Sequence, residues 1–505
     1  MRSKNALRNI IFYFFFEIIA LTCGVVFPKF IISFYGSEIN GLTSTITRLL
    51  SLISLIQASA IGAAIYQMYK PVASDDFYTQ SLIINSSKSF YKKVSAVYLL
   101  LSLCIAVAYS FYLSKENLSF FDIFLPFLIL SLNGAGVLLF NSVCDILLSS
   151  YQKRYLISIA SIAEQIIRYS LITVVLLARL HFIFIYFCYL IGGIVSIVFN
   201  LVFYRKYSKG KITKDFDHSF RIQNKKYLMV STIGSEVVTA SPVVIITTFI
   251  DLVSSSVFSI YSMIFVSMKT ILSSVQLSFN AIFGNLSKTT DDEYLLKAHN
   301  CIELLTFLMG TICAACVGFL IIPFMKLYSR GISDANYVNI LLGIFVVAYT
   351  LVFAFRASFG YLSTVYGLFK YTCYITIGFG LLGIAISVLC VLFFGMPFVM
   401  VGLLTNQICC SVVTLIIIKK KVPWYRINKL FYRLLIMFFV TICATALSFY
   451  CGGFITSWMK WILSAISVAL GSACIFILYC VLFDRESFFT LLKYAKQVLK
   501  RKELS

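Results

Sequence analysis

The segment PKFII at residues 28–32 recurs as PVVII at residues 242–246, 214 positions further along the chain. A second match follows in the same order, because DDFY at residues 75–78 returns as DDEY at residues 291–294, 216 positions later. Two short matches at nearly the same offset indicate that the chain contains a duplicated unit. Both copies of the first segment lie in long apolar runs, so the duplicated unit is expected to consist of membrane-spanning helices.

The composition indicates that lipid surrounds most of this protein. Of its 505 residues, 60% are hydrophobic and 12% are charged, whereas soluble domains carry about 25% charged residues. The net charge of +22 does not indicate nucleic-acid binding, because Lys and Arg lie mainly in short segments between apolar runs. The 15 cysteines have no metal-ligand spacing with the 3 histidines, so we expect reduced thiols and no metal site.

Apolar runs of about 20 residues can cross a bilayer as helices, and the sequence contains about fourteen of them. Basic residues precede the first run as in a signal peptide. However, Glu17 interrupts that run and no small-residue cleavage site follows it, so we expect it to remain as a transmembrane helix. The predicted spans are residues 8–34, 43–69, 94–113, 120–149, 155–178, 182–204, 227–250, 253–283, 301–324, 337–361, 371–394, 398–418, 430–450 and 458–483.

The distribution of Lys and Arg places both termini in the cytoplasm, because the loops that then face outward are short and poor in these residues. Six spans separate the two copies, so both halves share one orientation. We therefore predict an all-α integral membrane protein of about fourteen spans, whose two halves are related by a pseudo-two-fold axis along the membrane normal. The predicted parts are a bundle at 1–204, a basic cytoplasmic linker at 205–226, a second bundle at 227–418, two further helices at 419–483 and a basic amphipathic cytoplasmic tail at 484–505.

Two cytoplasmic segments have the pattern of helices that lie on a membrane surface. In residues 484–504, apolar side chains fall on one face and most basic side chains on the other, where anionic lipid would attract them. Residues 75–93 are a second candidate. A disordered tail is the alternative for the first segment.

Basic residues inside the apolar spans are the main candidates for substrate binding. A charge costs about 2.5–3.5 kcal/mol at a helix centre on insertion scales, so it tends to face a cavity or a partner. Lys29, Arg48 and Lys269, on the first, second and eighth spans, have no acidic residue at helical spacing. Such cations suit an anionic substrate such as a phosphate or pyrophosphate, and snorkelling to the headgroups is the alternative. Arg356 on the tenth span is a further candidate.

Acidic residues in the spans suit cation coupling or a proton relay. Glu236 on the seventh span is the best candidate, assisted by Asn406 on the twelfth, with a salt bridge to a cavity cation as an equal alternative. Glu164 and Arg168 have i, i+4 spacing on the fifth span, so we expect them to neutralise each other.

Two further acidic positions are candidates for lining a cavity. Asp145 forms a polar step with Asn141 on the fourth span, and Glu17 lies on the first. The alternative for the polar step is hydrogen bonding between helices, which is common wherever polar side chains lie in lipid.

The motifs that are missing favour a transporter over an enzyme. The sequence contains no phosphate-binding loop of the form GxxxxGK[S/T], and no convincing Ser/His/Asp or metal-ligand set. The external loops are too short to hold a catalytic domain. We therefore expect no catalytic residue, cofactor, bound nucleotide or nucleic acid, and energy drawn from an ion gradient, the membrane potential or the gradient of the substrate.

The first hundred residues resemble bacterial polysaccharide flippases of the multidrug/oligosaccharidyl-lipid/polysaccharide exporter superfamily. In that family a basic residue, here Lys29, precedes a G-x-x-x-x-G-L turn, here at residues 36–42. YKPVA at residues 69–73 looks like the family's cytoplasmic loop, and IY at 260–261 followed by NLS at 285–287 is similar to its eighth-helix pattern. Beyond about residue 330 the resemblance is limited to the hydropathy pattern.

The resemblance implies two six-helix bundles, a central cationic cavity and two additional C-terminal helices. It also implies flipping of an undecaprenyl-pyrophosphate-linked oligosaccharide to the outer leaflet of the bacterial plasma membrane, for surface polysaccharide (exopolysaccharide) biosynthesis. In related lipid II flippases, basic residues on the first, second and eighth helices face the cavity, and Lys29, Arg48 and Lys269 lie on the matching helices. A coupling carboxylate on the seventh helix would correspond to Glu236. The implied partners are membrane lipids, a polysaccharide polymerase and other assembly proteins.

Three other functions compete with this one. A multidrug or cation antiporter of the same superfamily would favour an acidic, aromatic cavity, so the cations count against it. A lipid II flippase is the second alternative. A polytopic glycosyltransferase or polymerase should carry a large external loop with paired acids or Arg, and this sequence has no such loop.

Overall fold

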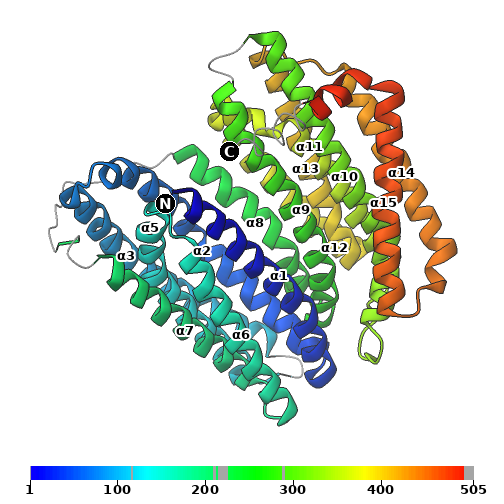
Figure 1. Cartoon of the computed structure of the whole chain (residues 1–505). Coiled ribbons are helices and arrows are strands. Elements are labelled where there is room, and N and C mark those ends of the chain that lie inside the picture. Colours follow the sequence, from blue (N-terminus) through cyan, green and yellow to red (C-terminus); the bar gives the residue numbers. More distant parts are fainter. Residues whose placement is uncertain (1, 115–117, 209–211, 214–225, 287–290, 494–505) are drawn as a thin grey trace. The chain divides into compact units, whose positions relative to one another are not determined.

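The computed structural model describes residues 2–114, 118–208, 212–213, 226–286 and 291–493, and these ranges form helices joined by short turns (Figure 1). The chain divides into two compact units. Unit 1 comprises Met1–Thr247 and Asp251–Ser256, and unit 2 comprises Thr248–Ile250 and Val257–Ser505. Most of the seventh predicted span therefore groups with unit 1, while the predicted domain limits stay a prediction.

The helices of the two units follow one another along the chain. Those of unit 1 are α1 (Arg2–Tyr35), α2 (Ser37–Ala73), α3 (Phe77–Leu113), α4 (Phe120–Gly136), the π-helical turn η1 (Val137–Asn141), α5 (Ser142–Ser150), α6 (Tyr155–Leu177), α7 (Ile183–Ser208) and most of α8 (Lys226–Phe249). Those of unit 2 are most of α9 (Leu252–Leu286), α10 (Asp292–Tyr328), α11 (Ile340–Val365), α12 (Phe369–Phe394), the short turn η2 (Met396–Phe398), α13 (Val399–Lys421), α14 (Asn428–Cys451), the turn η3 (Gly452–Phe454) and α15 (Trp458–Phe483).

The helices account for the predicted membrane spans. Among the described residues, 12 helices are long and apolar enough to cross a membrane, and α8 contains the shorter apolar helix Ile233–Phe249. The remaining predicted span, 43–69, lies within α2. Gly395 makes the tight break between the eleventh and twelfth spans possible, because its φ of 89° lies in the left-handed region that favours glycine. The all-helical membrane fold is confirmed.

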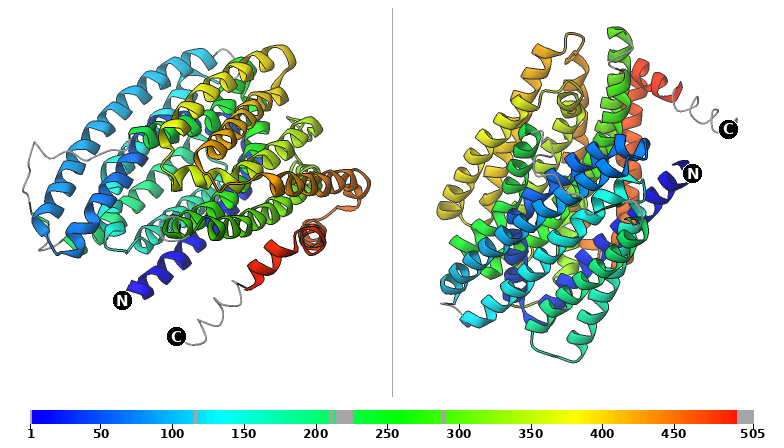
Figure 2. Two further views of the ribbon diagram at one scale, coloured as in Figure 1. Left: turned by 90° about the horizontal axis from the view of Figure 1, so that it is seen from above. Right: turned by 90° about the vertical axis from the view of Figure 1, so that its left-hand side faces the viewer.

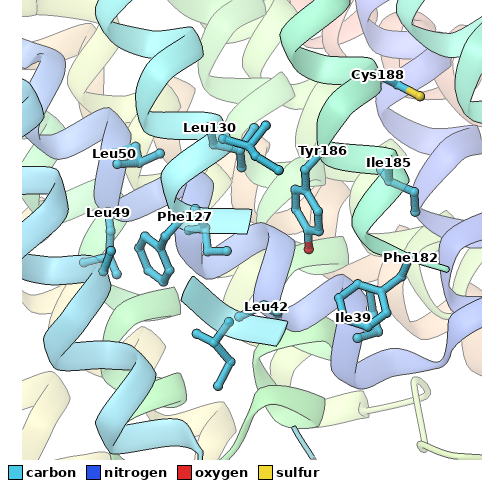
Figure 3. Packing of buried hydrophobic residues seen from close by; sticks show 14 of the residues in the cluster. Ile39, Leu42, Leu49, Leu50, Phe127, Leu130, Phe182, Ile185, Tyr186 and Cys188 are labelled. Carbon is cyan, nitrogen blue, oxygen red and sulfur yellow. The ribbon is translucent and has the colours of Figure 1, made fainter. Parts of the chain in front are cut away.

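The core of unit 1 is built mainly from aliphatic and aromatic side chains of α2, α4 and α7 (Figure 3). Leu42, Phe127 and Tyr186 are each fully buried. The hydroxyl of Tyr186 lies 2.8 Å from Oγ1 of Thr43, so the core also contains a hydrogen bond between α7 and α2. Close packing and such hydrogen bonds hold helices together in lipid, where burial of apolar surface contributes little to the association of helices.

The expectation of a surface helix at 75–93 was wrong. Residues 77–93 belong to α3, a single helix of 37 residues. At 1.5 Å per residue it is about 55 Å long, well above the hydrocarbon thickness of about 30 Å. Ile83, Ile84 and Tyr91 are buried in a cluster with side chains of α2 and α5. The first turns of α3 therefore pack inside unit 1, because their apolar side chains meet protein there and not a lipid surface.

Unit 2 is organised around α10, which packs against α11, α14 and α15. Its other main seam joins α12 and α13 through small residues, since a Cβ at Gly402 would lie 2.1 Å from the carbonyl oxygen of Gly383. After α15 the chain turns sharply, and residues 485–493 form a short helix in a new direction (Figure 2). Residues 494–505 of the predicted amphipathic tail lie outside the described residues.

Candidate functional site

The turn between α1 and α2 fixes the position of α2 against the start of α9 in unit 1. Gly36 has a φ of 86°, which favours glycine. Gly41 lies so close to the start of α9 that a Cβ would be 1.8 Å from the carbonyl oxygen of Leu252. These are the two glycines of the G-x-x-x-x-G-L motif, so its spacing has a structural reason: one glycine makes the turn and the other allows the close approach.

Hydrogen bonds continue along the same seam. Asn40 Nδ2 donates to Ser256 Oγ at 2.8 Å, and Thr45 Oγ1 lies 2.6 Å from Thr247 Oγ1 on α8. Positions 41, 45 and 48 fall on one face of a helix. The face of α2 that carries Arg48 is therefore the face that meets α8 and α9.

Arg48 and Glu236 are both half-buried in unit 1, and their charges interact. They come from α2 and α8, so the pairing depends on the seam just described. A carboxylate offsets part of the cost of holding a guanidinium within apolar helices. For Glu236, both the salt-bridge alternative and the coupling role stay predictions.

The predicted residues on α1 and α5 have local roles in the structure. Lys29 and Glu17 are half-buried on α1, and Glu17 accepts a hydrogen bond from Tyr13, one turn earlier. Asp145 accepts a hydrogen bond from Ser149 Oγ at 2.5 Å, also within one turn. These contacts satisfy part of the carboxylate hydrogen-bonding capacity along the same helix.

The polar step on the fourth span links two helices. Asn141 closes the π-helical turn η1, and its Nδ2 donates to Ser196 Oγ of α7 at 3.3 Å. This contact fits the alternative of helix–helix hydrogen bonding. The predicted ion pair between Glu164 and Arg168 is confirmed, with Arg168 Nη1 3.1 Å from Glu164 Oε1.

In unit 2, two predicted site residues meet the same part of α13. Arg356 of α11 donates from Nη1 to Gln407 Oε1 at 3.4 Å. Asn406, which precedes Gln407 on α13, is buried and accepts a hydrogen bond from Cys410 Sγ at 3.4 Å. Lys269 is half-buried on α9. The structure therefore brings Arg356 next to the part of α13 that carries Asn406 and Gln407.

Unit 2 contains a cluster of buried charges, centred on Arg433 of α14, that the sequence pattern did not predict. The Arg433 side chain is fully buried, with Nη1 2.8 Å from Glu303 Oε1 of α10 and Nε 3.0 Å from Asp484 Oδ2. Its Nη2 also bonds to Asp484. Lys429 Nζ lies 2.9 Å from Asp484 Oδ1. The cluster ties α10, α14 and the segment after α15 together.

A buried histidine extends this cluster. His299 Nε2 lies 3.0 Å from Glu303 Oε2, and Nδ1 lies 2.6 Å from the hydroxyl of Tyr361 on α11. The rings of Trp424 and Tyr425 pack beside the imidazole, with centroids 5.7 and 5.1 Å away. This set of groups is enclosed by protein, so it is suited to holding helices together and not to receiving a bulky substrate.

One signal could have revealed the cluster. Arg433 lies near the start of the thirteenth predicted span and Asp484 follows the fourteenth. Two adjacent spans joined by a short loop run antiparallel, so these positions lie at the same end of the pair. Among the described residues, no group of three or more His, Cys, Asp or Glu side chains is placed to hold a metal ion.

No protein-family model and no curated protein matches this sequence. Solved structures do match the fold. An inward-facing multidrug resistance MATE family transporter of the MOP superfamily gives a TM-score of 0.67 at 12% identity, over 80% of this chain and 94% of that chain. Lipid II flippase MurJ, in an inward closed conformation, gives 0.68 at 17% identity, over 94% and 99%. A MATE structure in complex with MaD3S gives 0.56 at 12% identity, over 84% and 96%.

These identities are low, so the likeness concerns the fold. This chain is a multi-pass helical membrane protein with the fold of MOP-superfamily transporters. That fold is shared by exporters and flippases, and the particular substrate has to be argued from the residues of this chain.

Proposed function

We propose that this protein is a flippase. It moves an undecaprenyl-pyrophosphate-linked oligosaccharide repeat unit across the bacterial plasma membrane by alternating access, with both chain termini in the cytoplasm. The observation that carries the proposal is the set of half-buried cations on apolar helices: Arg48, Lys269, Arg356 and Lys29. Half-buried cations of this kind attract anions such as a pyrophosphate, while a lipid tail stays in the bilayer.

The cations differ in how strongly they are already neutralised. The charge of Arg48 interacts with that of Glu236, whereas Arg356 donates a hydrogen bond to the neutral amide of Gln407. A neutral partner orients a guanidinium without cancelling its charge, so Arg356 keeps its attraction for an anion. Partial neutralisation at Arg48 would keep binding modest, and modest binding allows release of the head group on the other side.

Lipid II flipping and drug export remain candidate functions of the same fold. The half-buried cations on the apolar helices favour an anionic, lipid-linked head group over a cationic drug. Loss of viability on deletion of the gene would indicate lipid II, and drug resistance on overexpression would indicate export of drugs.

The test uses cells that lack the gene and carry plasmid-borne variants. Arg48→Ala, Lys269→Ala and Arg356→Ala are expected to lower surface polysaccharide about tenfold, because a charge-assisted contact contributes about 1.5–3 kcal/mol. Lipid-linked repeat units should accumulate in the inner leaflet at the same time. Lys93→Ala removes an exposed cation of α3 and serves as the matched control. Normal surface polysaccharide in all three variants, at wild-type protein levels, would refute the proposal.

A further inference from the structure

Unit 2 contains a narrow groove between α11 and α14, with α10 as its floor. Its volume is about 130 Å³. Gly318, Ile322 and Pro323 line the floor, and Ile344 and Phe449 stand on the two sides. Ile344 and Phe449 are 46% and 59% exposed, so the groove opens on the surface that faces lipid.

The polar groups in the groove are already satisfied. Ser448 Oγ donates to the carbonyl oxygen of Phe319 at 2.6 Å, and Thr445 Oγ1 donates to that of Thr441 at 2.8 Å. The groove therefore presents hydrocarbon to its occupant. An apolar cavity of about 150 Å³ can hold a benzene molecule, so this one has room for a short segment of a hydrocarbon chain.

A cation lies at one end of the groove. Lys326 is exposed, lines the groove, and has no ion pair with any carboxylate of the described residues. Two more basic side chains contact Thr456, in the loop between η3 and α15. Arg330 Nη1 donates to the carbonyl oxygen of Thr456 at 2.8 Å, and Lys460 Nζ lies 3.3 Å from Thr456 Oγ1. Three basic side chains therefore lie at or near this end of the groove.

Tryptophans mark the depth of this end in the membrane. Trp458 and Trp461 lie with ring centroids 6.3 Å apart, and Trp461 packs on Phe324 at 5.8 Å. Tryptophan gathers at the level of lipid headgroups. Lys326, two residues after Phe324 on α10, is thus placed at headgroup level, while the apolar part of the groove extends toward the hydrocarbon.

We propose that this groove is a binding site for one anionic phospholipid of the surrounding bilayer. One acyl chain lies over Gly318 and Ile322, and the phosphate contacts Lys326. A second groove, of about 600 Å³ between α14 and α15, is less suited to an anionic head, because its Lys429 is already 2.9 Å from Asp484 and 3.5 Å from Glu486. The site is independent of the transported substrate.

The test is native mass spectrometry of the purified full-length protein, titrated separately with dioleoyl phosphatidylglycerol and dioleoyl phosphatidylcholine. The wild type should retain one phosphatidylglycerol in preference to phosphatidylcholine. Lys326→Gln should weaken that binding about fivefold, the effect of one Lys beside an anionic headgroup. Gly453→Leu should weaken it as well, because a Cβ at Gly453 meets no other atom within 4 Å and the larger side chain would fill the mouth of the groove.

Matched controls separate this site from general lipid binding. Gly471→Leu adds the same bulk on α15, where a Cβ also meets no atom within 4 Å, and Lys370→Gln removes an exposed cation elsewhere in unit 2. Both should bind like the wild type. Equal binding of the two lipids, unchanged binding in Lys326→Gln or Gly453→Leu, or displacement of phosphatidylglycerol by an equal concentration of undecaprenyl phosphate would each overturn the proposal.

Discussion

Replacing Arg433 by Met should destabilise unit 2 strongly, because the substitution leaves two buried carboxylates without their main cation. The Arg433 side chain is 0% exposed, and the side chains of Glu303 and Asp484 are 1% and 4% exposed. Methionine fills most of the same volume with an apolar chain. The substitution therefore tests the charge and its hydrogen bonds with little change in packing.

The magnitude follows from burial and from the remaining partners. Breaking a buried ion pair from one side costs about 3–5 kcal/mol. Lys429 stays 2.9 Å from Asp484, and His299 stays 3.0 Å from Glu303, so we expect the lower end of that range, about 3 kcal/mol. For a unit of 150–250 residues each kcal/mol corresponds to about 2–4 °C, which gives a fall in Tm of about 10 °C.

The assay is thermal unfolding followed with a thiol-reactive fluorophore, since all 15 cysteines are free thiols. Cys301 and Cys480 are buried beside the cluster, and Cys301 Sγ contacts the carbonyl oxygen of Ser487 at 3.7 Å. These two thiols should label at lower temperature in Arg433→Met than in the wild type. Cys144, which is buried in unit 1, provides the internal reference.

A second variant separates the charge effect from general damage. Adding Glu303→Gln to Arg433→Met replaces one of the two carboxylates that have lost their cation by a neutral amide. The double variant should therefore recover about 1–3 kcal/mol of the lost free energy of unfolding. An unchanged Tm in Arg433→Met, or a double variant as unstable as the sum of the two single variants, would refute the reasoning.

Three further predictions follow from other parts of the structure. Gly41→Ala should lower Tm by several degrees, because its Cβ would lie 1.8 Å from a backbone oxygen of α9, while Gly62→Ala on the same helix meets nothing within 4 Å and should be neutral. Burial alone would raise the pKa of Asp484, but Arg433 holds that pKa below its usual value. The stability that the ionised Asp484 contributes is therefore present above about pH 4 and is lost as the pH falls further. Asp484→Asn should accordingly flatten the acid limb of a curve of Tm against pH. Arg356→Lys should keep part of the polysaccharide output that Arg356→Ala loses, because a lysine retains the charge without the planar guanidinium, and equal output from the two variants would contradict a role for that charge.

The sequence alone was enough to determine the membrane fold and the order of the spans. Runs of about 20 apolar residues have one stable solution in lipid, a helix that satisfies its own backbone. Even the narrow break at Gly395 and the i, i+4 pair of Glu164 and Arg168 could be predicted, because both depend on residues close together in the chain.

Only the tertiary structure decided which charges meet. Arg433 bonds to Glu303 and Asp484, which lie 130 and 51 positions away, and Arg48 interacts with Glu236 on another helix. Helices that are apolar on every side give little indication of how each is rotated about its axis, so hydropathy cannot show which face meets a neighbour. The rotation is set by close approaches such as the one at Gly41, and those exist only once the helices have packed.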